Sequence, residues 1–565
     1  MKTTSAVLAA LAATLVIGTL HAQVGERPIP RLVQKDGRFA LFVDDAPFLI
    51  LGVEDQDLGL ESTWPSHPKD WAAMEYLHAN TIEIPIYWDQ IEEQPGQFNF
   101  SSIDRLLAEA RQHNVRLVLL WFATWKNGSQ HYMPEWMLLD PVRYFHAVDR
   151  NGEAVDSPSP FAAASLEADK KAFAAVMGHL KEADPQRTVI MVQVENETGN
   201  WKSVRDFSPA AQKFFEAPVP PEILKAMNVK TASQSPNWRE AFGPNADEYF
   251  NAWAVARYVG QVAAAGKAVY PLPMDANAAL RNPFNPGPPG EPGVPAAYES
   301  GGPTDNVIPI WKAAAPSIDI LAPDDYQGDP AAYVKVLELY RRDDNPLFLP
   351  ESGCFQCDPA TGDFTRYFFT ILGLQAIGDS ESSTEPVPYL ARNFVLAGPM
   401  QREIARLNFE GKLKAVAEPL HFKGSDQGDP RQKLPFGSWN AVVTYGTALF
   451  GPSTAGSNPT AQGRALVAQL SDNQFLVAGY FCTVDFFPAG TAQQRASQHI
   501  VEGTGQIPSA LIDGKWQHRQ FLRVEQGVYD NGVFKLLRSQ NGDATDYGLK
   551  FGEEPVVLRV TLATY

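Results

Sequence analysis

Short apolar runs alternate with longer amphipathic stretches between about residue 38 and residue 415. Each run is nearly continuous in apolar residues, which is typical of a strand covered on both faces, and the stretches between the runs have helical periodicity. The predicted strands are Phe48–Val53, Thr81–Tyr87, Arg116–Phe122, Val189–Glu197, Lys267–Pro273, Ile318–Pro323, Leu347–Glu351 and Gln375–Gly378. The clearest predicted helices are Ser102–His113, Leu166–Lys181 and Asp247–Ala265.

Eight such strand and helix units predict an α/β fold, a closed (β/α)8 TIM barrel. A doubly wound open sheet has the same alternation of strands and helices, but proteins with that fold typically carry a Gly-rich turn that binds phosphate. The sequence has neither G-x-G-x-x-G after a strand nor a Walker loop. Two long segments, Asn200–Gly243 and the Pro- and Gly-rich Asn282–Pro303, follow the predicted fourth and fifth strands. Loops after barrel strands lie on the C-terminal face, where barrel enzymes build their sites.

The pattern changes after a last helix predicted at Glu403–Leu413. Runs of strand length follow, separated by turn signals such as Asn531-Gly532. These runs are Phe436–Phe450, Arg464–Leu470, Gln474–Phe487, Gln520–Val524, Val533–Ser539 and Val556–Thr564. We therefore expect a barrel over residues 23–415 and a smaller all-β domain, either a sandwich or a jelly roll, over residues 416–565.

The first 22 residues have the features of an export signal. Lys2 supplies a positive charge, Ala6–Leu20 is a short charge-free stretch, and Ala22 offers a small residue for cleavage. An uncleaved anchor or a cut one or two residues away stays open. No other stretch approaches the roughly 20 apolar residues that cross a bilayer. The sequence thus predicts a periplasmic or secreted protein with no membrane contact after cleavage.

Composition excludes several classes of protein. Among 565 residues, 47 Lys and Arg face 65 Asp and Glu, and this net charge of −18 argues against a nucleic acid partner. Three Cys are too few for a disulfide scaffold: Cys354 and Cys357 form either a local disulfide or two thiols, and Cys482 lies in an apolar run. The ten His lack metal-ligand spacing, and H-E-x-x-H and G-x-S-x-G are absent, so we expect no metal and no cofactor.

Two glutamates stand at the ends of apolar strands. TVIMVQVENETG ends the predicted fourth strand, and a period of two places Gln193, Glu195 and Glu197 on one face; NPLFLPESG ends the seventh at Glu351. Strands four and seven lie across the barrel mouth, so two carboxyl groups there can flank one glycosidic bond. One protonates the leaving oxygen and the other attacks the anomeric carbon, with retention of configuration when they stand about 5 Å apart. That each glutamate caps a loop or pairs with a basic residue remains the alternative.

Several segments resemble family 35 β-galactosidases, in particular a bacterial subgroup with an appended β domain. They are IMVQVENETG, NTIEIPIYWDQIEEQPGQFNFSSID, LVLLWFATWKNG, SGGPTDNVIPIWKAAAPSIDILAPDDY, FLPESG and RSQNGDATDYGLKFGEEPVVLRVTL. The resemblance implies that Glu197 is the acid/base, Glu351 the nucleophile, Asn196 the partner of the sugar 2-OH, and Tyr326 a hydrogen-bond partner of Glu351. It also implies that Asn277 lies near the sugar. Because alternation points Asn196 away from Glu197, these roles require a bulge or twist at the strand end.

Further candidates follow from their place at strand ends. Sugar C–H faces pack on aromatic rings with a polar rim, so Trp88 and the stretch Trp125-Lys126-Asn127 are expected to line the substrate site. Trp121 belongs to an apolar run and is expected in the core. Glu54, at the end of the first strand, is expected either to accept hydrogen bonds from sugar hydroxyls or to form an ion pair.

Together these features predict an exported, cofactor-free, retaining exo-acting glycoside hydrolase. The resemblance favours a β-galactosidase that acts on side chains of plant polysaccharides or their oligosaccharides, including those derived from xyloglucan. A barrel glycosidase of another specificity and a non-catalytic carbohydrate-binding protein are the alternatives. The sequence leaves the linkage preference, the oligomeric state and the role of the β domain open.

Overall fold

The computed structural model describes residues 27–55, 68–230, 233–353, 367–382, 388–419, 431–445, 458, 461–491, 493–497, 506–530, 532–540 and 542–565. The predicted export signal, Cys354, Cys357 and the last five residues of the predicted run Phe436–Phe450 lie outside these ranges. Among the helices that the structure describes, none has the length and apolar character that a membrane span requires.

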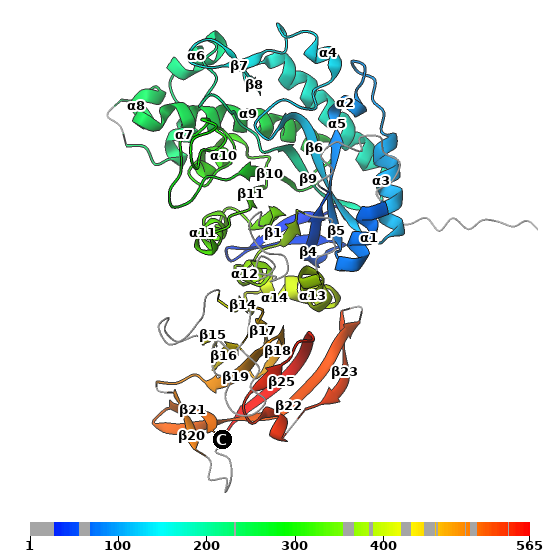
Figure 1. Cartoon of the computed structure of the whole chain (residues 1–565), viewed down its shortest axis with the longest axis vertical. Helices are drawn as coiled ribbons and strands as arrows, with labels where there is room; N and C mark the ends of the chain where they lie inside the picture. The colour runs from blue at the N-terminus through cyan, green and yellow to red at the C-terminus, as the bar shows by residue number, and fades with distance from the viewer. Residues whose placement is uncertain are drawn as a thin grey trace, which may run out of the picture.

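Eight parallel strands close into a barrel, which confirms the predicted TIM-barrel fold (Figure 1). In the order around the barrel, they are β10 (Met274–Ala279), β11 (Ile320–Asp325), β12 (Phe348–Ser352), β13 (Gly378–Glu381), β4 (Ile50–Glu54), β5 (Thr81–Tyr87), β6 (Arg116–Lys126) and β9 (Val189–Asn196). Every strand is buried along nearly its whole length, because side chains fill the interior and helices cover the outside.

The helices that cover the barrel and its loops vary widely in length. They are α1 (Pro68–Leu77), α2 (Trp88–Ile91), α3 (Ser101–Gln112), α4 (Glu135–Leu138), α5 (Ala163–Ala183), α6 (Pro209–Glu216), α7 (Pro221–Ala226), α8 (Trp238–Phe242), α9 (Ala246–Val269), α10 (Ile308–Ala314), α11 (Pro330–Tyr340), α12 (Tyr367–Gly373), α13 (Pro388–Ala397) and α14 (Gln401–Phe409). Three of them, α6 to α8, fall in the long segment after β9, and an isolated bridge between Asn200 and Ser300 joins this segment to the long loop after β10.

The prediction of the fifth strand was wrong. Lys267–Pro273 was expected to be a strand, but α9 continues to Val269 and the strand is the next segment, Met274–Ala279. The helix buries apolar residues on most of its surface, so its last turn has the unbroken apolar pattern of a strand. The strand itself carries Asp275 and Asn277 toward the barrel interior and therefore lacks that pattern.

A small antiparallel sheet closes the bottom of the barrel. It consists of β1 (Arg31–Lys35), β2 (Arg38–Val43) and β3 (Ala46–Phe48). Leu41, Val43 and Phe48 share an apolar cluster with interior residues of the barrel strands, including Val118 and Ile320. This cluster fills the amino-terminal end of the barrel interior with apolar side chains. A separate ribbon, β7 (His146–Val148) with β8 (Ala154–Pro158), lies in the loop after β6.

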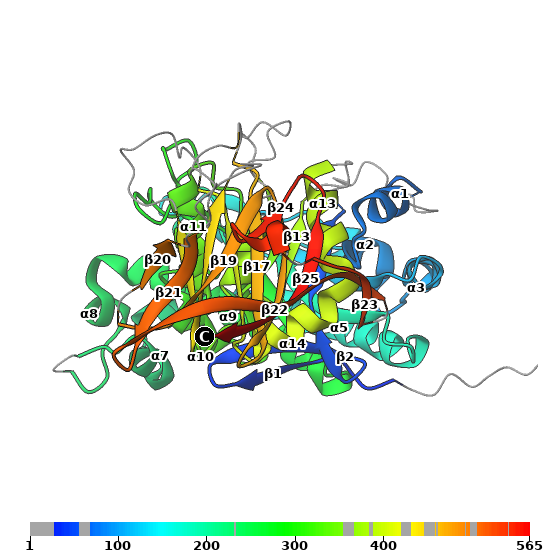
Figure 2. The same ribbon diagram turned by 90° about the horizontal axis from the view of Figure 1, so that it is seen from below.

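The carboxyl-terminal region forms two antiparallel sheets, as the sequence predicted for an all-β domain (Figures 1 and 2). One sheet has the order β14 (Leu413–Ala417), β17 (Arg464–Ser471), β18 (Gln474–Tyr480), β25 (Val556–Thr564), β22 (Lys515–Asp530), β21 (Gln506–Ile512) and β20 (Gln493–Ser497), and β23 (Val533–Ser539) pairs with β22. The other is β15 (Gln432–Phe436), β16 (Trp439–Tyr445), β19 (Cys482–Pro488) and β24 (Leu549–Phe551).

The first sheet of this sandwich is buried on both faces near the barrel. Val467 and Val477 point into the apolar core between the two sheets. Leu466, Leu476 and Tyr480 point the other way and join the apolar core of the barrel. The Tyr480 hydroxyl donates a hydrogen bond to the Asn393 side chain of α13. The barrel and the sandwich therefore share apolar core residues where they meet.

We expect Leu476→Ala to lower the free energy of unfolding by about 2–5 kcal/mol, since Leu476 is fully buried where the sandwich meets the barrel. The matched control is Leu537→Ala in β23, because Leu537 is 62% exposed and its truncation should change stability by less than about 0.5 kcal/mol. Urea unfolding followed by intrinsic fluorescence measures both. Separate transitions for the barrel and the sandwich in the unmodified protein would contradict a shared core.

Candidate active site

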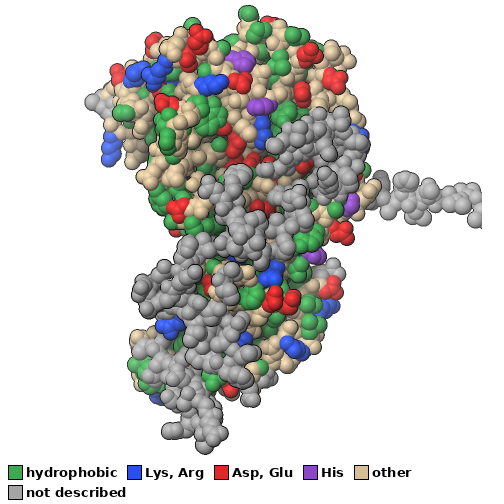
Figure 3. All heavy atoms as spheres, in the orientation of Figure 1, with side chains coloured by type: hydrophobic (Ala, Val, Ile, Leu, Met, Phe, Trp, Pro, Cys, Tyr) green, Lys and Arg blue, Asp and Glu red, His purple; other side chains and the backbone are tan. Residues whose placement is uncertain are grey.

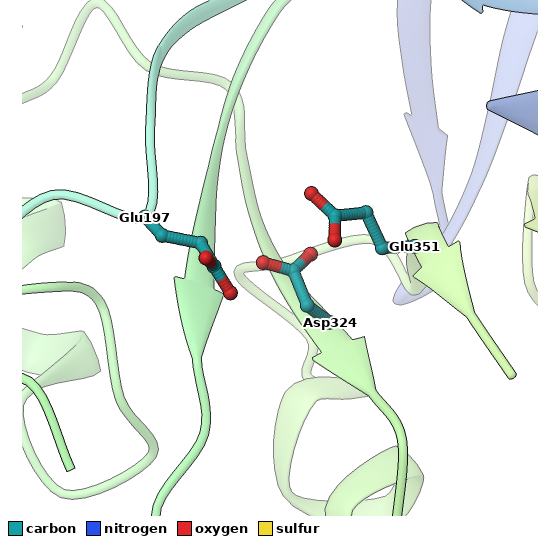
Figure 4. Close-up of side chains that lie close together, drawn as sticks. All are labelled: Glu197, Asp324 and Glu351. Carbon is teal, nitrogen blue, oxygen red and sulfur yellow. The ribbon is translucent and has the colours of Figure 1, made fainter. Parts of the chain in front are cut away.

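Three carboxyl groups meet at the carboxyl-terminal end of the barrel. One oxygen each from Glu197, Asp324 and Glu351 lies within 4.8 Å of the other two, and Figure 4 shows Asp324 between the two glutamates. Asp324 of β11 pairs in register with Glu351 of β12, so the sheet itself places these two side by side. Asp324 and Glu351 are buried, and Glu197, directly after β9, is half-buried.

A break in strand alternation brings Asn196 and Glu197 to the site together. Glu195 and Glu197 have left-handed backbones, with φ of 66° and 42°, which side chains with a Cβ rarely adopt. The expectation that Gln193, Glu195 and Glu197 share one face is therefore wrong. Glu195 turns outward, where its carboxylate accepts a 2.7 Å hydrogen bond from the Trp125 main-chain N–H, and Asn196 turns inward toward Gln193.

The seventh strand also departs from alternation. A period of two would place Leu347 and Leu349 on the same face as Glu351, but both leucines pack in the apolar layer outside the barrel, while Glu351 reaches the interior. The pairing of β12 with β13 shifts between Leu349 and Ser352, which accounts for the change of face. Both glutamates thus enter the site through local irregularities that a period of two does not foresee.

Asn277 connects the two glutamates. Its side-chain oxygen accepts a 2.8 Å hydrogen bond from the main-chain N–H of Glu197, and its side-chain nitrogen donates to Glu351 at 3.1 Å and to Asn196 at 3.2 Å. Asn196 in turn donates to Asn127, which lies at the end of β6, at 3.2 Å. A chain of amides therefore holds the ends of three strands in a fixed relation to Glu351.

Glu351 receives two hydrogen bonds, one on each oxygen. Tyr326 donates its hydroxyl to Oε2 at 2.9 Å, and Asn277 donates to Oε1 at 3.1 Å. A hydrogen bond donated to each oxygen orients a carboxylate and stabilises its charged form. The sequence placed Tyr326 next to Glu351 on the basis of the family resemblance, and this hydrogen bond is present.

Lys126 supplies a positive charge to the site. Burial alone would lower the pKa of its ammonium group, but the surrounding carboxyl groups raise it. These groups, in order of their effect, are Glu351, Glu54, Glu197 and Asp324. Glu54 ends β4 and is buried, so its charge acts directly on this cluster. Acidic side chains are also visible in the middle of the barrel on the face shown in Figure 3.

The environment of Glu197 suits a group that holds a proton near neutral pH. Burial and the charge of Glu351 raise its pKa to about 7, although the charge of Lys126 and the adjacent Asp324 side chain oppose the shift. Burial raises the pKa of Asp324 well above its ordinary value, and the charges of Glu351 and Glu197 add to this effect. A pair with one proton-holding and one doubly hydrogen-bonded carboxyl group can perform acid/base and nucleophilic chemistry.

Two predicted aromatic residues do not reach this site. Trp88 and Trp125 are both fully buried in the apolar cluster between the strands and the helices, so the structure corrects the expectation that they line it. The Trp88 indole donates to Glu92, directly after α2, and lies against Trp121, and the Trp125 ring meets Tyr258 of α9 edge to face. Large rings at these strand ends fill the layer between the barrel and its helices.

Two residues of the site, Asp324 and Glu299, were not singled out from the sequence. Asp324 lies two residues before Tyr326, which the family resemblance places at the site, so a period of two counted back from Tyr326 would have found it. Glu299 lies in the long loop after β10, where it is buried, accepts a hydrogen bond from Trp201 at 2.8 Å and feels the charge of Glu197. No pattern in its irregular segment distinguishes it.

Two family models match parts of the sequence. Residues 61–264 match a β-galactosidase model, Glyco_hydro_42, and residues 390–552 match a domain of unknown function, DUF5597. The first region contains β5, β6, β9 and Glu197. The closed barrel establishes a TIM-barrel fold, and a stretch of about a third of the chain is similar to a glycoside hydrolase model. The β-galactosidase model that matches is Glyco_hydro_42, and the family 35 resemblance has no matching model among these findings.

Solved structures with a similar chain path include several carbohydrate-active enzymes. A β-galactosidase from Marinomonas ef1 is 13% identical, with a TM-score of 0.41 over 58% of this chain and 53% of that chain. A β-galactosidase from Rahnella sp. R3 is 17% identical, with a TM-score of 0.43 over 66% and 59%. An exo-β-1,4-mannosidase from Opitutaceae bacterium strain TAV5 is 17% identical, with a TM-score of 0.38 over 67% and 62%. Comparison with curated proteins finds no match.

Below the site, the barrel interior holds further buried carboxyl groups. Asp275 of β10 is fully buried, and burial is the main cause that raises its pKa to about 8. Glu83 of β5 is also fully buried, and burial together with the charge of Asp275 raises its pKa well above the ordinary value. A carboxyl group with a raised pKa is neutral in the folded protein at pH values where the unfolded chain is ionised.

The protein should therefore lose stability as the pH rises. The contribution of Asp275 is fully present below about pH 4 and is lost as the pH rises through its folded pKa of about 8, by at most about 1.4 kcal/mol per pH unit. Asp275→Asn removes this titration and should flatten the curve between pH 5 and pH 8. Chemical denaturation at several pH values tests this, with Asp472→Asn in an exposed turn as the control. Equal slopes for Asp275→Asn and the unmodified protein would contradict the assignment.

Proposed function

We propose that this protein is a retaining, exo-acting glycoside hydrolase, a β-galactosidase that removes terminal galactosyl residues by double displacement. The observation that carries the proposal is the approach of Glu197 and Glu351, whose nearest carboxylate oxygens lie within 4.8 Å of each other. Retaining glycosidases hold their two carboxyl groups about 5 Å apart, whereas inverting enzymes need a gap of about 6.5–9.5 Å for a water molecule.

In this mechanism Glu351 attacks the anomeric carbon. Its two hydrogen bonds, from Tyr326 and Asn277, hold the carboxylate in one orientation for attack. Glu197, with a pKa of about 7, protonates the leaving oxygen and then, as a carboxylate, activates the water that releases the sugar. Asn196, held by Gln193 and Asn277, is the proposed partner of the sugar 2-OH.

The substrate class rests on sequence similarity. The β-galactosidase model covers the region that supplies Lys126, Asn196 and Glu197, which supports a β-galactoside as substrate. The strand-end motifs that resemble family 35 support galactosyl side chains of plant polysaccharides or their oligosaccharides, including xyloglucan fragments. The predicted export signal supports action in the periplasm or outside the cell, where such polymers are met.

Three variants test this proposal with an aryl β-galactoside. Glu351→Ala should lower kcat/KM by at least about 10⁴-fold, because it removes the nucleophile. Glu197→Ala should lose activity mainly on substrates with poor leaving groups, since good ones need no proton from the enzyme. An activated fluorosugar should label Glu351, which peptide mass spectrometry detects.

Glu338→Gln in the exposed face of α11 is the matched control and should keep full activity. A panel of nitrophenyl glycosides identifies the sugar. Labelling of a residue other than Glu351, or unchanged turnover by Glu351→Ala, would overturn the proposed mechanism.

A further inference from the structure

Asp324 is the third carboxyl group of the site and has no role in the two-glutamate mechanism. It is 3% exposed, and neither of its oxygens accepts a hydrogen bond from a nitrogen or hydroxyl donor within the described part of the chain. An ionised carboxylate that is buried without donors is strongly unfavourable. A protonated carboxyl group avoids this penalty and becomes a hydrogen-bond donor itself.

The neighbours of Asp324 favour its protonated form. Three carboxyl groups and one ammonium group face it from four different elements: Glu351 of β12, Glu197 after β9, Glu54 of β4 and Lys126 of β6. Even when Glu197 holds its proton, the two carboxyl groups of Glu351 and Glu54 outweigh the one ammonium group of Lys126, so the potential at Asp324 is negative. Like charges in one site cannot all ionise, so at least one carboxyl group of such a cluster keeps its proton.

The available acceptors are unequal. Both oxygens of Glu351 already receive hydrogen bonds, from Tyr326 and Asn277. The carboxyl group of Glu197 receives none from a nitrogen or hydroxyl donor among the residues that the structure describes, and Asp324 lies against it (Figure 4). A proton on Asp324 is therefore best shared with Glu197.

We infer that Asp324 is a positioning residue that stays protonated and donates a hydrogen bond to Glu197. This inference rests on the proposed function, in which Glu197 is the acid/base. The hydrogen bond stabilises the carboxylate that Glu197 becomes after it protonates the leaving group, and it holds that carboxylate in place for the attack of water. The other charged groups near Glu197 are Glu351, Lys126 and Glu299, and all stay unchanged in the variants below.

Two substitutions separate a protonated from an ionised Asp324 by the direction of one pKa. If Asp324 donates a hydrogen bond, Asp324→Ala removes the donor, and the basic limb of the kcat/KM profile should move up by about 1 pH unit. Asp324→Asn keeps a neutral donor and should leave that limb near its original position. If Asp324 is ionised, both substitutions remove a negative charge, and both should move the limb down.

The activities of the two Asp324 variants should differ in the same way as their pH profiles. In Asp324→Ala, kcat should fall at least about 10-fold on substrates with poor leaving groups, with little change in KM, because Glu197 becomes a weaker acid. Asp324→Asn should recover most of this loss. Asp325→Asn is the matched control: it lies on the same strand, but its carboxylate accepts from the Gln327 main-chain N–H and faces Tyr333 and Asp379.

A second measurement needs no turnover. Carbodiimide modifies protonated carboxyl groups, so the rate of Glu197 modification against pH, read by peptide mass spectrometry, follows its titration in the folded protein. A pH midpoint of Glu197 modification that is highest in Asp324→Ala, and close to that of the unmodified protein in Asp324→Asn, supports the inference. Downward shifts in both variants, no shift in either, or a rise in KM with unmoved limbs would overturn it.

These readouts also keep the two proposals apart. If the protein turns over no glycoside but Glu197 titrates as described, the proposed function fails and the hydrogen bond stands. If β-galactosides are hydrolysed and the pH midpoint of Glu197 modification is the same in the Asp324 variants as in the unmodified protein, the proposed function stands and the inference fails. Asp324→Asn decides the sign of the shift by itself, so the test survives if Asp324→Ala does not fold.

Discussion

The chemistry of this protein depends on one electrostatic constraint: several buried carboxyl groups surround the ammonium group of Lys126 at the barrel mouth. Glu197, Asp324 and Glu351 stand within 4.8 Å of one another, and Lys126 is the cation among them. Such a cluster is stable only when protons are distributed unequally over its members. Unequal protonation is also what a retaining glycosidase requires, because one carboxyl group must donate a proton while the other attacks.

The fold supplies this arrangement through its strand ends. Parallel strands deliver Asp324 and Glu351 as register partners, and the two left-handed residues Glu195 and Glu197 bring the end of β9 to face them. Asn277 then fixes the distance between Glu197 and Glu351, because its side-chain amide is hydrogen-bonded to the backbone of Glu197 and to the carboxylate of Glu351. The apolar cluster at the bottom of the barrel fills the end of the interior opposite the site.

Sequence patterns recovered the parts of the molecule that follow regular periods. The runs Thr81–Tyr87, Val533–Ser539 and Val556–Thr564 coincide with β5, β23 and β25. The fifth strand was missed because its interior residues are polar, while the buried helix before it is not. The site follows a similar division. Glu197 and Glu351 were found as polar residues after apolar runs, but the direction of their side chains depends on a backbone break and a register shift that the sequence pattern does not contain. Asp324 was passed over because its partners come from other strands.

Aromatic residues show a second limit of reasoning from sequence. Trp88 and Trp125 stand at strand ends, as sugar-binding residues do, yet both are sealed between the barrel and its helices. Position in the sequence alone does not say whether a ring faces the cleft or the helical layer, since a shift of one residue along a strand turns its side chain to the opposite face. Lys126, the neighbour of Trp125, faces the carboxyl cluster instead.

The central claim, that Glu197 and Glu351 act as a close pair on one glycosidic bond, is tested most directly by the stereochemistry of the first product. Proton NMR of an aryl β-galactoside mixed with a high concentration of enzyme shows which anomer of the free sugar forms before mutarotation. The account predicts the β-anomer first, with the α-anomer appearing only as the sugar equilibrates. Initial release of the α-anomer would contradict it, because inversion requires a water molecule between the two carboxyl groups.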